Sequence, residues 1–388
     1  MIRGLDIVAI KMLTGDRLKY IGLVAGLFFA SLLVVQQSSI FHGYASRTES
    51  WIRDLSGVDL WVMDPQVEFS DDIKPMAQTK LGRVRGVTGV DWAVPMFKSY
   101  LKTRLPDGSL MNVRVIGLDD ASLLGGPLQM VQGSLADLRQ DRAVIVNHAD
   151  VNDQLRLRKG EDGQPRPLRP GDRLTISDHD MKVVGVFRST TEFFWDPVVY
   201  TTFTRALSIA PPERKLTMFL LVKVKPGLDP AEVGRRIAAE TGLQVHTPDS
   251  FAQMTKMWVL KKTGILINFG ITIALGFIIG VLVAGQTLYT FIVDNLRQFG
   301  ALKAMGASNA MVVRMVVIQI LVAGFIGYGL GLGCAACTGL AFGSIGMAFK
   351  MVWQIPVIGA VAILLCCLVA GWISIRRVLK LEPAVVFK

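Results

Sequence analysis

Four long apolar stretches constrain this 388-residue chain more than any other feature of its sequence. Each reaches or exceeds the roughly 20 residues that a helix needs to cross the hydrocarbon core of a membrane. None carries an acidic residue in its interior, which agrees with the cost of burying an unpaired charge in lipid. We therefore predict four transmembrane helices, at residues 20–41, 264–293, 315–349 and 355–375.

Lysine and arginine residues flank these stretches unevenly and predict their orientation. Segments rich in lysine and arginine stay in the cytoplasm according to the positive-inside rule. The connection between the third and fourth stretches has a single basic residue, Lys350, and is therefore expected on the other side. We expect three cytoplasmic segments: residues 1–19, which are amphipathic, the link 294–309 and the tail 376–388. Residues 42–262 would then lie outside the cytoplasm. The deciding residues are Arg3, Lys11, Arg17 and Lys19, then Arg297, Lys303 and Arg314, and finally Arg376, Arg377, Lys380 and Lys388.

Composition excludes two classes of function. The net charge is +11, but no basic patch with interleaved aromatic residues is present, so we expect no nucleic-acid partner. The basic flanks of the apolar stretches explain this charge. With 51% hydrophobic residues, the chain is also too apolar for an ordinary soluble enzyme.

The sequence offers no catalytic or metal-binding motif. It has no phosphate-binding loop, His-Glu-x-x-His run or Ser/His/Asp grouping, so we expect no catalysis, no metal and no cofactor in this chain. Cys334-x-x-Cys337 has the spacing of a redox or metal motif, but buried small side chains in an apolar helix explain it better. In Asp178-His179-Asp180, a tight link between two strands explains the aspartates better than a metal does.

Residues 42–262 are predicted to form one α+β domain on an otherwise membrane α-helical chain. Its two ends look like the split halves of one sandwich, with a mostly-β insertion at about 119–216 between them. The aromatic run 191–203 is either the core of that insertion or a surface that docks a ligand or partner. We expect the last helix of the domain to run without a break into the second transmembrane helix. The predicted strands span 58–63, 89–104, 110–118, 143–147, 173–177, 181–187, 218–225 and 243–246, and the predicted helices span 70–85, 229–241 and 251–262.

Small residues recur at four-residue spacing in three of the apolar stretches. Residues at i and i+4 share one face of a helix, and small side chains there let two helix backbones approach closely. We expect these faces to pack helix against helix, and the sequence leaves open which of them join two copies of the chain. The glycines concerned are Gly22 and Gly26, Gly276 and Gly280, and Gly327 and Gly331.

The link 294–309 is the most informative stretch of the chain. Its Asp-Asn pair can begin a short helix, and Gly306 can end it. Phe299, Leu302 and Met305 would then form an apolar stripe on one face of that helix. We predict a coupling helix that seats this stripe in a soluble partner, with two basic side chains orienting the approach. Its residues are Arg297, Phe299, Gly300, Leu302, Lys303, Met305 and Gly306.

The link resembles the signature Arg-Glu-Ile-Gly-x-Leu-Arg-Ala-Leu-Gly-Ala-Ser of FtsX-like permeases, the MacB-type group of ABC transporters. Gln298 stands where that signature has Glu, so any ionic contact made by the Glu would be missing here. The four-helix layout and the large outer domain are also similar to this family. A weaker similarity, in Asp59-Leu60-Trp61-Val62-Met63, points to the DevC-like permeases of heterocyst-type exporters. Other matching runs are Val87-Thr88-Gly89-Val90, Val183-Val184-Gly185-Val186 and Arg376-Arg377-Val378-Leu379-Lys380-Leu381-Glu382-Pro383-Ala384.

This resemblance implies the permease subunit of an ATP-driven exporter in a bacterial inner membrane, and not an enzyme. A separate ABC ATPase would bind ATP and Mg and drive a conformational change that reaches the outer domain. A second permease copy, a periplasmic adaptor and an outer-membrane duct are further partners that the resemblance implies. Two alternatives stay open: an FtsX-like regulatory protein that activates a cell-wall hydrolase outside the cell, and a membrane-anchored sensor or binding module.

Overall fold

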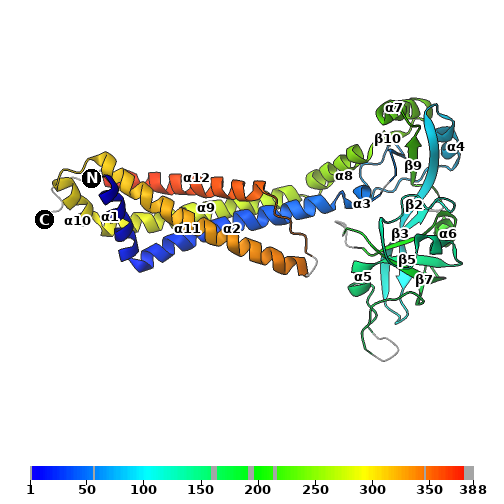
Figure 1. The fold of residues 1–388 in the computed structure, drawn as a ribbon, viewed down its shortest axis with the longest axis horizontal. Helices are drawn as coiled ribbons and strands as arrows, with labels where there is room; N and C mark the ends of the chain where they lie inside the picture. Colours follow the sequence, from blue (N-terminus) through cyan, green and yellow to red (C-terminus); the bar gives the residue numbers. More distant parts are fainter. Residues whose placement is uncertain are drawn as a thin grey trace. The chain divides into compact units, whose positions relative to one another are not determined.

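A computed structural model describes residues 2–55, 57–158, 164–190, 196–212, 216–344 and 347–379. The chain divides into two compact units, whose elements are labelled in Figure 1. The helical unit comprises Met1–Tyr44 and Gly264–Lys388, and the sheet unit comprises Ala45–Thr263. The sheet unit is therefore one continuous segment between two parts of the helical unit.

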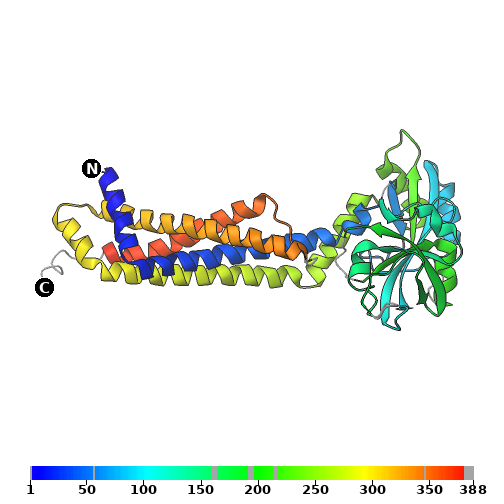
Figure 2. The same ribbon diagram turned by 60° about the horizontal axis from the view of Figure 1, so that its bottom comes forward.

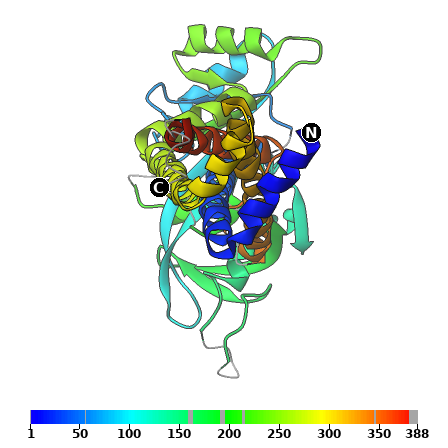
Figure 3. The ribbon, with the colours of Figure 1, turned by 90° about the vertical axis from the view of Figure 1, so that its left-hand side faces the viewer.

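Four helices of the helical unit are long and apolar enough to cross a membrane, as the sequence predicts: α2, α9, α11 and α12. Figure 2 shows them running side by side, and Figure 3 shows the unit from the end that carries α1 and α10. The helices of this unit within the described residues are α1 (Ile2–Gly15), α2 (Arg17–Arg47), α9 (Ile265–Asp294), α10 (Leu296–Ala304), α11 (Asn309–Ser344) and α12 (Gln354–Leu379).

The third membrane helix differs from its predicted span of 315–349, because α11 begins and ends earlier. The described residues that follow it, 347–353, are not helical. There the Lys350 backbone N–H donates to the Ser39 carbonyl oxygen of α2, at 3.1 Å. The Phe349 ring lies against a glycine of α11. The apolar residues of this segment therefore pack against their own bundle instead of lengthening the span.

The glycines at four-residue spacing hold α2 against α9 and α11. A Cβ atom on Gly26 would lie 2.6 Å from Val283 Cγ1, and one on Gly331 would lie 2.6 Å from Ser31 Cβ. Such distances are too short for real side chains, so the backbones approach this closely because glycine has no Cβ. The same holds for Gly276 against Leu33, Gly280 against Ala30 and Gly327 against Leu27, while Gly22 faces Thr287 at an ordinary distance. The structure thus uses these faces within one chain.

The sheet unit contains a ten-stranded sheet in the order β10-β1-β9-β2-β3-β8-β5-β7-β4, with β6 pairing with β2 and β7. The long strand β2 pairs with β9 near its start and with β3 near its end. Because β1 pairs with both β9 and β10, the two ends of the unit lie together, as the sequence predicts. The strands are β1 (Leu60–Met63), β2 (Val90–Arg104), β3 (Leu110–Leu118), β4 (Gln129–Gln132), β5 (Ala143–Asn147), β6 (Arg173–Ile176), β7 (His179–Arg188), β8 (Val198–Thr202), β9 (Phe219–Val224) and β10 (Gln244–His246).

Short helices cover this sheet, and α4 and α7 pack on the part that β1 and β9 form. In α7, Asp229 caps the first turn by accepting from the Ala231 N–H at 3.1 Å, and Gly242 ends the helix with φ 68°. The named helices of this unit are α3 (Ser50–Arg53), α4 (Thr79–Gly86), the 3₁₀ helix η1 (Leu135–Arg139), α5 (His148–Asn152), α6 (Phe203–Ile209), α7 (Pro230–Thr241) and α8 (Pro248–Lys262).

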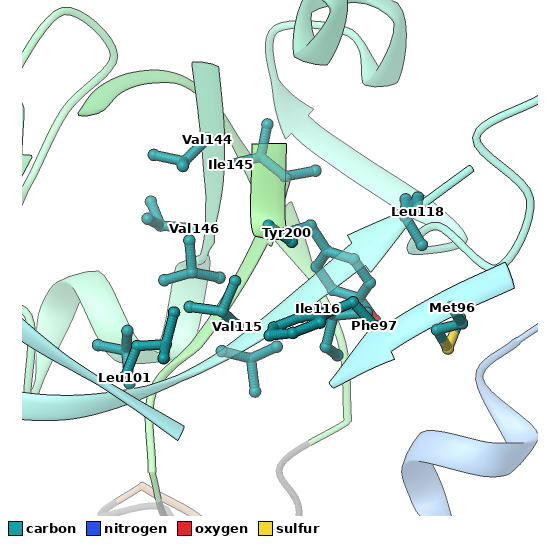
Figure 4. Close-up of a cluster of buried hydrophobic side chains, with 14 of the residues drawn as sticks. Met96, Phe97, Leu101, Val115, Ile116, Leu118, Val144, Ile145, Val146 and Tyr200 are labelled. Carbon is teal, nitrogen blue, oxygen red and sulfur yellow. The ribbon is translucent and has the colours of Figure 1, made fainter. Parts of the chain in front are cut away.

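An apolar core fills the middle of the sheet unit, and Figure 4 shows part of it around Val115, Val146 and Tyr200. The Tyr200 ring meets the Phe187 ring edge to face, with 5.0 Å between the ring centroids. Tyr200 belongs to the aromatic run 191–203, whose first five residues lie outside the described residues. The described aromatic residues of the run are buried, which favours the core interpretation for this part.

The predicted helix at 70–85 is wrong over most of its length, because only α4 is helical there. Pro75 interrupts the stretch, since it has no N–H and disfavours the helical conformation of the preceding residue. The next backbone N–H, of Met76, donates instead to the Thr217 carbonyl oxygen at 2.8 Å. The polar residues before Pro75 therefore take part in tertiary contacts rather than in a helix.

The link between β6 and β7 is shorter than predicted. The turn consists of Ser177 and Asp178, whose φ angles are 45° and 65°. His179 and Asp180 already pair with Ile176 and Thr175 in the strands, so only Asp178 of the predicted turn Asp178-His179-Asp180 belongs to the turn. Two consecutive residues with positive φ are typical of a two-residue type I′ hairpin, which matches the twist of the flanking strands.

The predicted continuous helix from 251–262 into the second membrane helix is also wrong. The α8 helix ends at Lys262, and Gly264 adopts a left-handed conformation with φ 70° before α9 begins. The Val259 carbonyl oxygen in the last turn of α8 accepts from both the Thr263 N–H, at 3.1 Å, and the Thr263 hydroxyl, at 2.6 Å. By contrast, α2 runs without a break from Arg17 to Arg47.

Candidate functional site

The link between α9 and α11 folds into the short helix α10, and its start is built differently from the prediction. Asn295 precedes α10, but its side chain makes no cap bond to this helix. Its amide Nδ2 donates backwards to the Phe291 carbonyl oxygen, at 2.8 Å, and so closes the end of α9. The two helices therefore meet at one residue without an intervening loop.

Gly306 ends α10 as predicted, with φ 95°. The Gly306 N–H donates to Lys303 O at 3.0 Å, and the Ala307 N–H donates to Leu302 O at 2.9 Å. These two bonds form a Schellman motif, which requires the left-handed conformation that glycine adopts without steric cost. The turn therefore fixes the direction in which the chain enters α11.

The apolar stripe predicted for this helix is divided between the inside and the outside of the helical unit. Phe299 is fully buried, at 0% exposure, in an apolar cluster with Phe291 and Val312. Leu302 is half-buried against the same cluster, whereas Met305 is 77% exposed. The prediction that Phe299 seats in a partner is therefore wrong, because its ring is already enclosed by its own chain. Gly300, on the same side, is buried as well.

The exposed face of α10 is instead formed by Arg297, Ala301, Ala304 and Met305. Residues three and four apart lie on one side of a helix, so these side chains form one surface. Gln298 lies exposed beside it, and Lys303 is half-buried. Sequence reasoning missed the alanines, because an alanine fits an inner face as well as an outer one.

A groove of about 810 Å³ lies beside this exposed face. Two of its lining residues, Asn295 and Gln298, come from the link. The others come from α1 and the turn that follows it: Val8, Lys11, Met12, Gly15, Asp16 and Arg17. Two of the three segments that the sequence predicts to be cytoplasmic thus line one groove, and polar and basic side chains are among its lining residues.

Buried contacts and ion pairs fix α1 in this position. Ala9 and Leu13 of α1 are buried in the same cluster as Phe299. The Arg314 guanidinium of α11 binds both carboxylate oxygens of Asp6, with distances of 2.9 and 3.1 Å. The buried Gln319 Nε2 donates to the Ala9 carbonyl oxygen at 3.0 Å. One face of the amphipathic segment 1–19 therefore packs on the helical unit itself.

A second set of ion pairs joins α9 to the start of α2. The Lys19 ammonium lies 2.6 Å from an oxygen of Asp16 and 2.5 Å from an oxygen of Asp294. The hydrogen bond from Lys19 lowers the pKa of Asp16 below its ordinary value. One lysine thus connects the α1–α2 turn to Asp294, the last residue of α9 and the first of the link.

The sheet unit holds a buried charge cluster that sequence reasoning missed. The Asp71 carboxylate lies 2.9 Å from the Lys98 ammonium and 3.5 Å from Arg114 Nε, and both cations are fully buried. The Tyr100 hydroxyl donates to Asp71 at 3.1 Å, and the Lys98 ammonium lies 3.7 Å from the centroid of the Trp51 ring. Because the carboxylate is enclosed with its partners, we assign the cluster a structural role.

The described residues of the two units do not show the arrangement of a metal-dependent site. Among the described residues, no group of three or more His, Cys, Asp or Glu side chains could hold a metal ion. His179 Nδ1 lies 2.7 Å from the Ser177 carbonyl oxygen, an interaction within its own hairpin. The link, α1 and the start of α2 instead present an exposed surface that includes Lys11, Arg17 and Arg297.

Comparison with known protein families decides which kind of membrane protein carries such a surface. A family model described as the MacB-like periplasmic core domain matches residues 21–240, more than half of the chain. A second model, the FtsX-like permease C-terminal domain, matches residues 270–383. The chain is an FtsX/MacB-type ABC permease. No curated protein matches it.

Solved structures of related domains resemble part of this permease. The extracellular domain of YknZ, a noncanonic ABC-type transporter from Gram-positive bacteria, is 14% identical, with 49% of this chain and 99% of that chain covered and a TM-score of 0.34. The periplasmic region of MacB from Actinobacillus actinomycetemcomitans is 14% identical, with coverages of 52% and 94% and a TM-score of 0.36. A domain of a permease protein from Porphyromonas gingivalis is 15% identical, with coverages of 49% and 85% and a TM-score of 0.29.

As an FtsX/MacB-type permease, the chain is a non-enzymatic membrane subunit of an ABC transporter, and its family implies partnership with an ABC ATPase. The link lies inside the region that matches the FtsX-like model.

Proposed function

We propose that this permease couples ATP hydrolysis by a separate ABC ATPase to a conformational change of its sheet unit, in the service of export. The observation that carries the proposal is the division of α10 into a face buried with Phe299 and an exposed face around Ala301 and Met305. A partner bound to the exposed face would move the buried face with it. The helical unit would then respond to the state of the ATPase.

Two features of the chain would transmit such a movement. Phe299 shares its apolar cluster with buried residues of α9 and α11, so α10 cannot shift without disturbing both helices. The α2 helix is continuous from the end of the groove to Arg47, at the start of the sheet unit. A continuous helix is stiffer than the α8–α9 connection, which Gly264 interrupts. We therefore assign transmission to α2.

The remaining parts of the complex follow from the same proposal. The ATPase binds ATP and Mg, and the permease supplies no cofactor. Both termini and the link face the cytoplasm of a bacterium, and the sheet unit faces the periplasm. A second permease copy completes the complex, and a periplasmic adaptor with an outer-membrane duct receives the exported substrate.

Substitutions on the two faces of α10 test the docking role of the exposed face. Met305→Asp and Ala301→Trp place a charge or a bulky ring at the interface, and we expect each to weaken ATPase binding about 30-fold or more, as loss of a buried anchor does. The measurement is affinity purification from native membranes, with quantification of the co-purifying ATPase and of its ATP turnover. Leu110→Asp, at another exposed apolar position, is the matched control and should leave co-purification unchanged.

Phe299→Ala tests the buried face of α10, and we expect it to change the stability of the helical unit rather than the docking surface itself. Removing this buried ring should destabilise the helical unit by about 3–5 kcal/mol, as a large cavity does. The proposal fails if Met305→Asp and Ala301→Trp both co-purify with the ATPase at wild-type levels. Export is replaced by the regulatory alternative under a different result. In that case the wild-type permease binds the ATPase, but loss of the permease changes only the activity of a cell-wall hydrolase outside the cell.

A further inference from the structure

An apolar groove of about 470 Å³ runs between α11 and α12 in the helical unit. Its walls include Val317 and Leu321 from α11 and Leu368 and Ile375 from α12. Gly371 opens the groove, because a Cβ atom there would meet only Ile320 Cγ2 of the floor, at 3.8 Å. All lining residues are apolar, and the groove lies within two helices able to cross a membrane, so water is an unfavourable occupant.

The groove has a charged rim. Trp372 lines it and is 57% exposed, and the Arg376 guanidinium lies 3.6 Å from the centroid of the Trp372 ring. Stacking on the indole uses the flat face of the guanidinium, and its N–H groups, which point outward from the edge, are suited to bind an oxyanion. Arg376 is followed in the sequence by two further basic residues, Arg377 and Lys380. Basic residues immediately beyond a transmembrane helix are typical of sites that attract anionic lipid headgroups.

We propose that this groove binds one anionic phospholipid, with an acyl chain along the apolar walls and the phosphate at Arg376. The groove lies in the size range of ligand pockets, and its two parts match the two parts of a phospholipid. A second copy of the chain is the competing occupant, but an apolar helix face offers no anion for Arg376. This inference is independent of ATPase docking, because the groove residues lie outside the link.

Native mass spectrometry of the full-length chain tests the site. The purified protein is equilibrated in detergent with phosphatidylglycerol or phosphatidylcholine that carry identical acyl chains. We expect one phosphatidylglycerol retained per chain, with a preference over phosphatidylcholine of about fivefold, the effect of one basic residue near an anionic headgroup. Arg376→Gln should abolish this preference, whereas Arg297→Gln, which removes an exposed arginine outside the groove, should keep it.

Filling the groove provides the second test. Gly371→Phe should reduce the retention of both lipids, because its ring would occupy the acyl-chain position. Ile373→Phe is the matched control, since this exposed residue of the same helix does not line the groove. Leu321→Trp fills the groove from the opposite helix and serves if Gly371→Phe does not fold. Equal retention of the two lipids by the wild type overturns the proposal. The proposal is also overturned if a groove-filling variant converts dimers of the chain into monomers but retains as much lipid as the wild type. That result would show that a second copy of the chain occupies the groove.

Discussion

At the scale of single residues, the buried charge cluster of the sheet unit is where a small change should have the largest effect. Burial by itself would raise the pKa of Asp71, but the charges of Lys98 and Arg114 outweigh it and lower this pKa to about 2. Burial raises the pKa of Tyr100, so its hydroxyl stays protonated and donates to the carboxylate. The ionised form of Asp71 is thus the form that the cluster stabilises.

Asp71→Asn should therefore lower the free energy of unfolding by about 3–5 kcal/mol, the cost of removing one partner from a buried ion pair. Chemical denaturation of the full chain in detergent measures this change. Asp180→Asn is the control, because the Asp180–Arg173 pair is largely exposed and should contribute less than about 1 kcal/mol.

The pH dependence of the same variant follows from the lowered pKa. The stability that ionised Asp71 supplies is present above its unfolded pKa of about 4. It is lost as the pH falls from there toward the folded pKa of about 2. The difference in the free energy of unfolding between the wild type and Asp71→Asn should be constant above pH about 4 and should shrink between pH about 4 and about 2. A difference that stays the same at low pH would contradict the ionised cluster.

At the scale of elements, the glycine faces determine how closely α2 approaches α11. Gly331→Leu places a side chain where Ser31 of α2 lies, so we expect about 1–3 kcal/mol of destabilisation from overpacking. Gly333→Leu is the matched control, because no atom of a neighbouring element lies within 4 Å of a Cβ built on Gly333. Thermal unfolding in detergent measures the effect on folding, and the oligomeric state of the same sample measures the effect on assembly. If Gly331→Leu dissociates dimers without lowering stability, this face joins two copies instead.

At the scale of the whole molecule, the sidedness of the two units determines how the permease can work. Single cysteines at Ser308 and Ala121, in a chain without its native cysteines, report the location of the link and of the sheet unit. A membrane-impermeant thiol reagent added to spheroplasts should label Ala121→Cys and leave Ser308→Cys unlabelled, because basic segments stay in the cytoplasm. The reverse pattern would show that the link faces outward and cannot meet a cytoplasmic ATPase.

The sequence by itself determined the features that depend only on residues close together along the chain. Four membrane helices follow from apolar runs long enough to satisfy their backbone hydrogen bonds within lipid. Gly306 was predicted to end α10 because its position and residue type are local signals, and the structure gives it a φ of 95°. The link signature was equally local, which is why it identified the family.

Only the tertiary structure decided the features that depend on contacts between segments far apart in the sequence. The sequence could not show that Phe299 faces inward, because an apolar stripe on a helix suits a partner and the protein's own core equally well. It could not reveal the Asp71 cluster, since Lys98 and Arg114 meet Asp71 only after β2 and β3 have paired. Periodicity along the chain tells which residues share a face, but burial, ion pairing and helix contacts depend on what folds against that face.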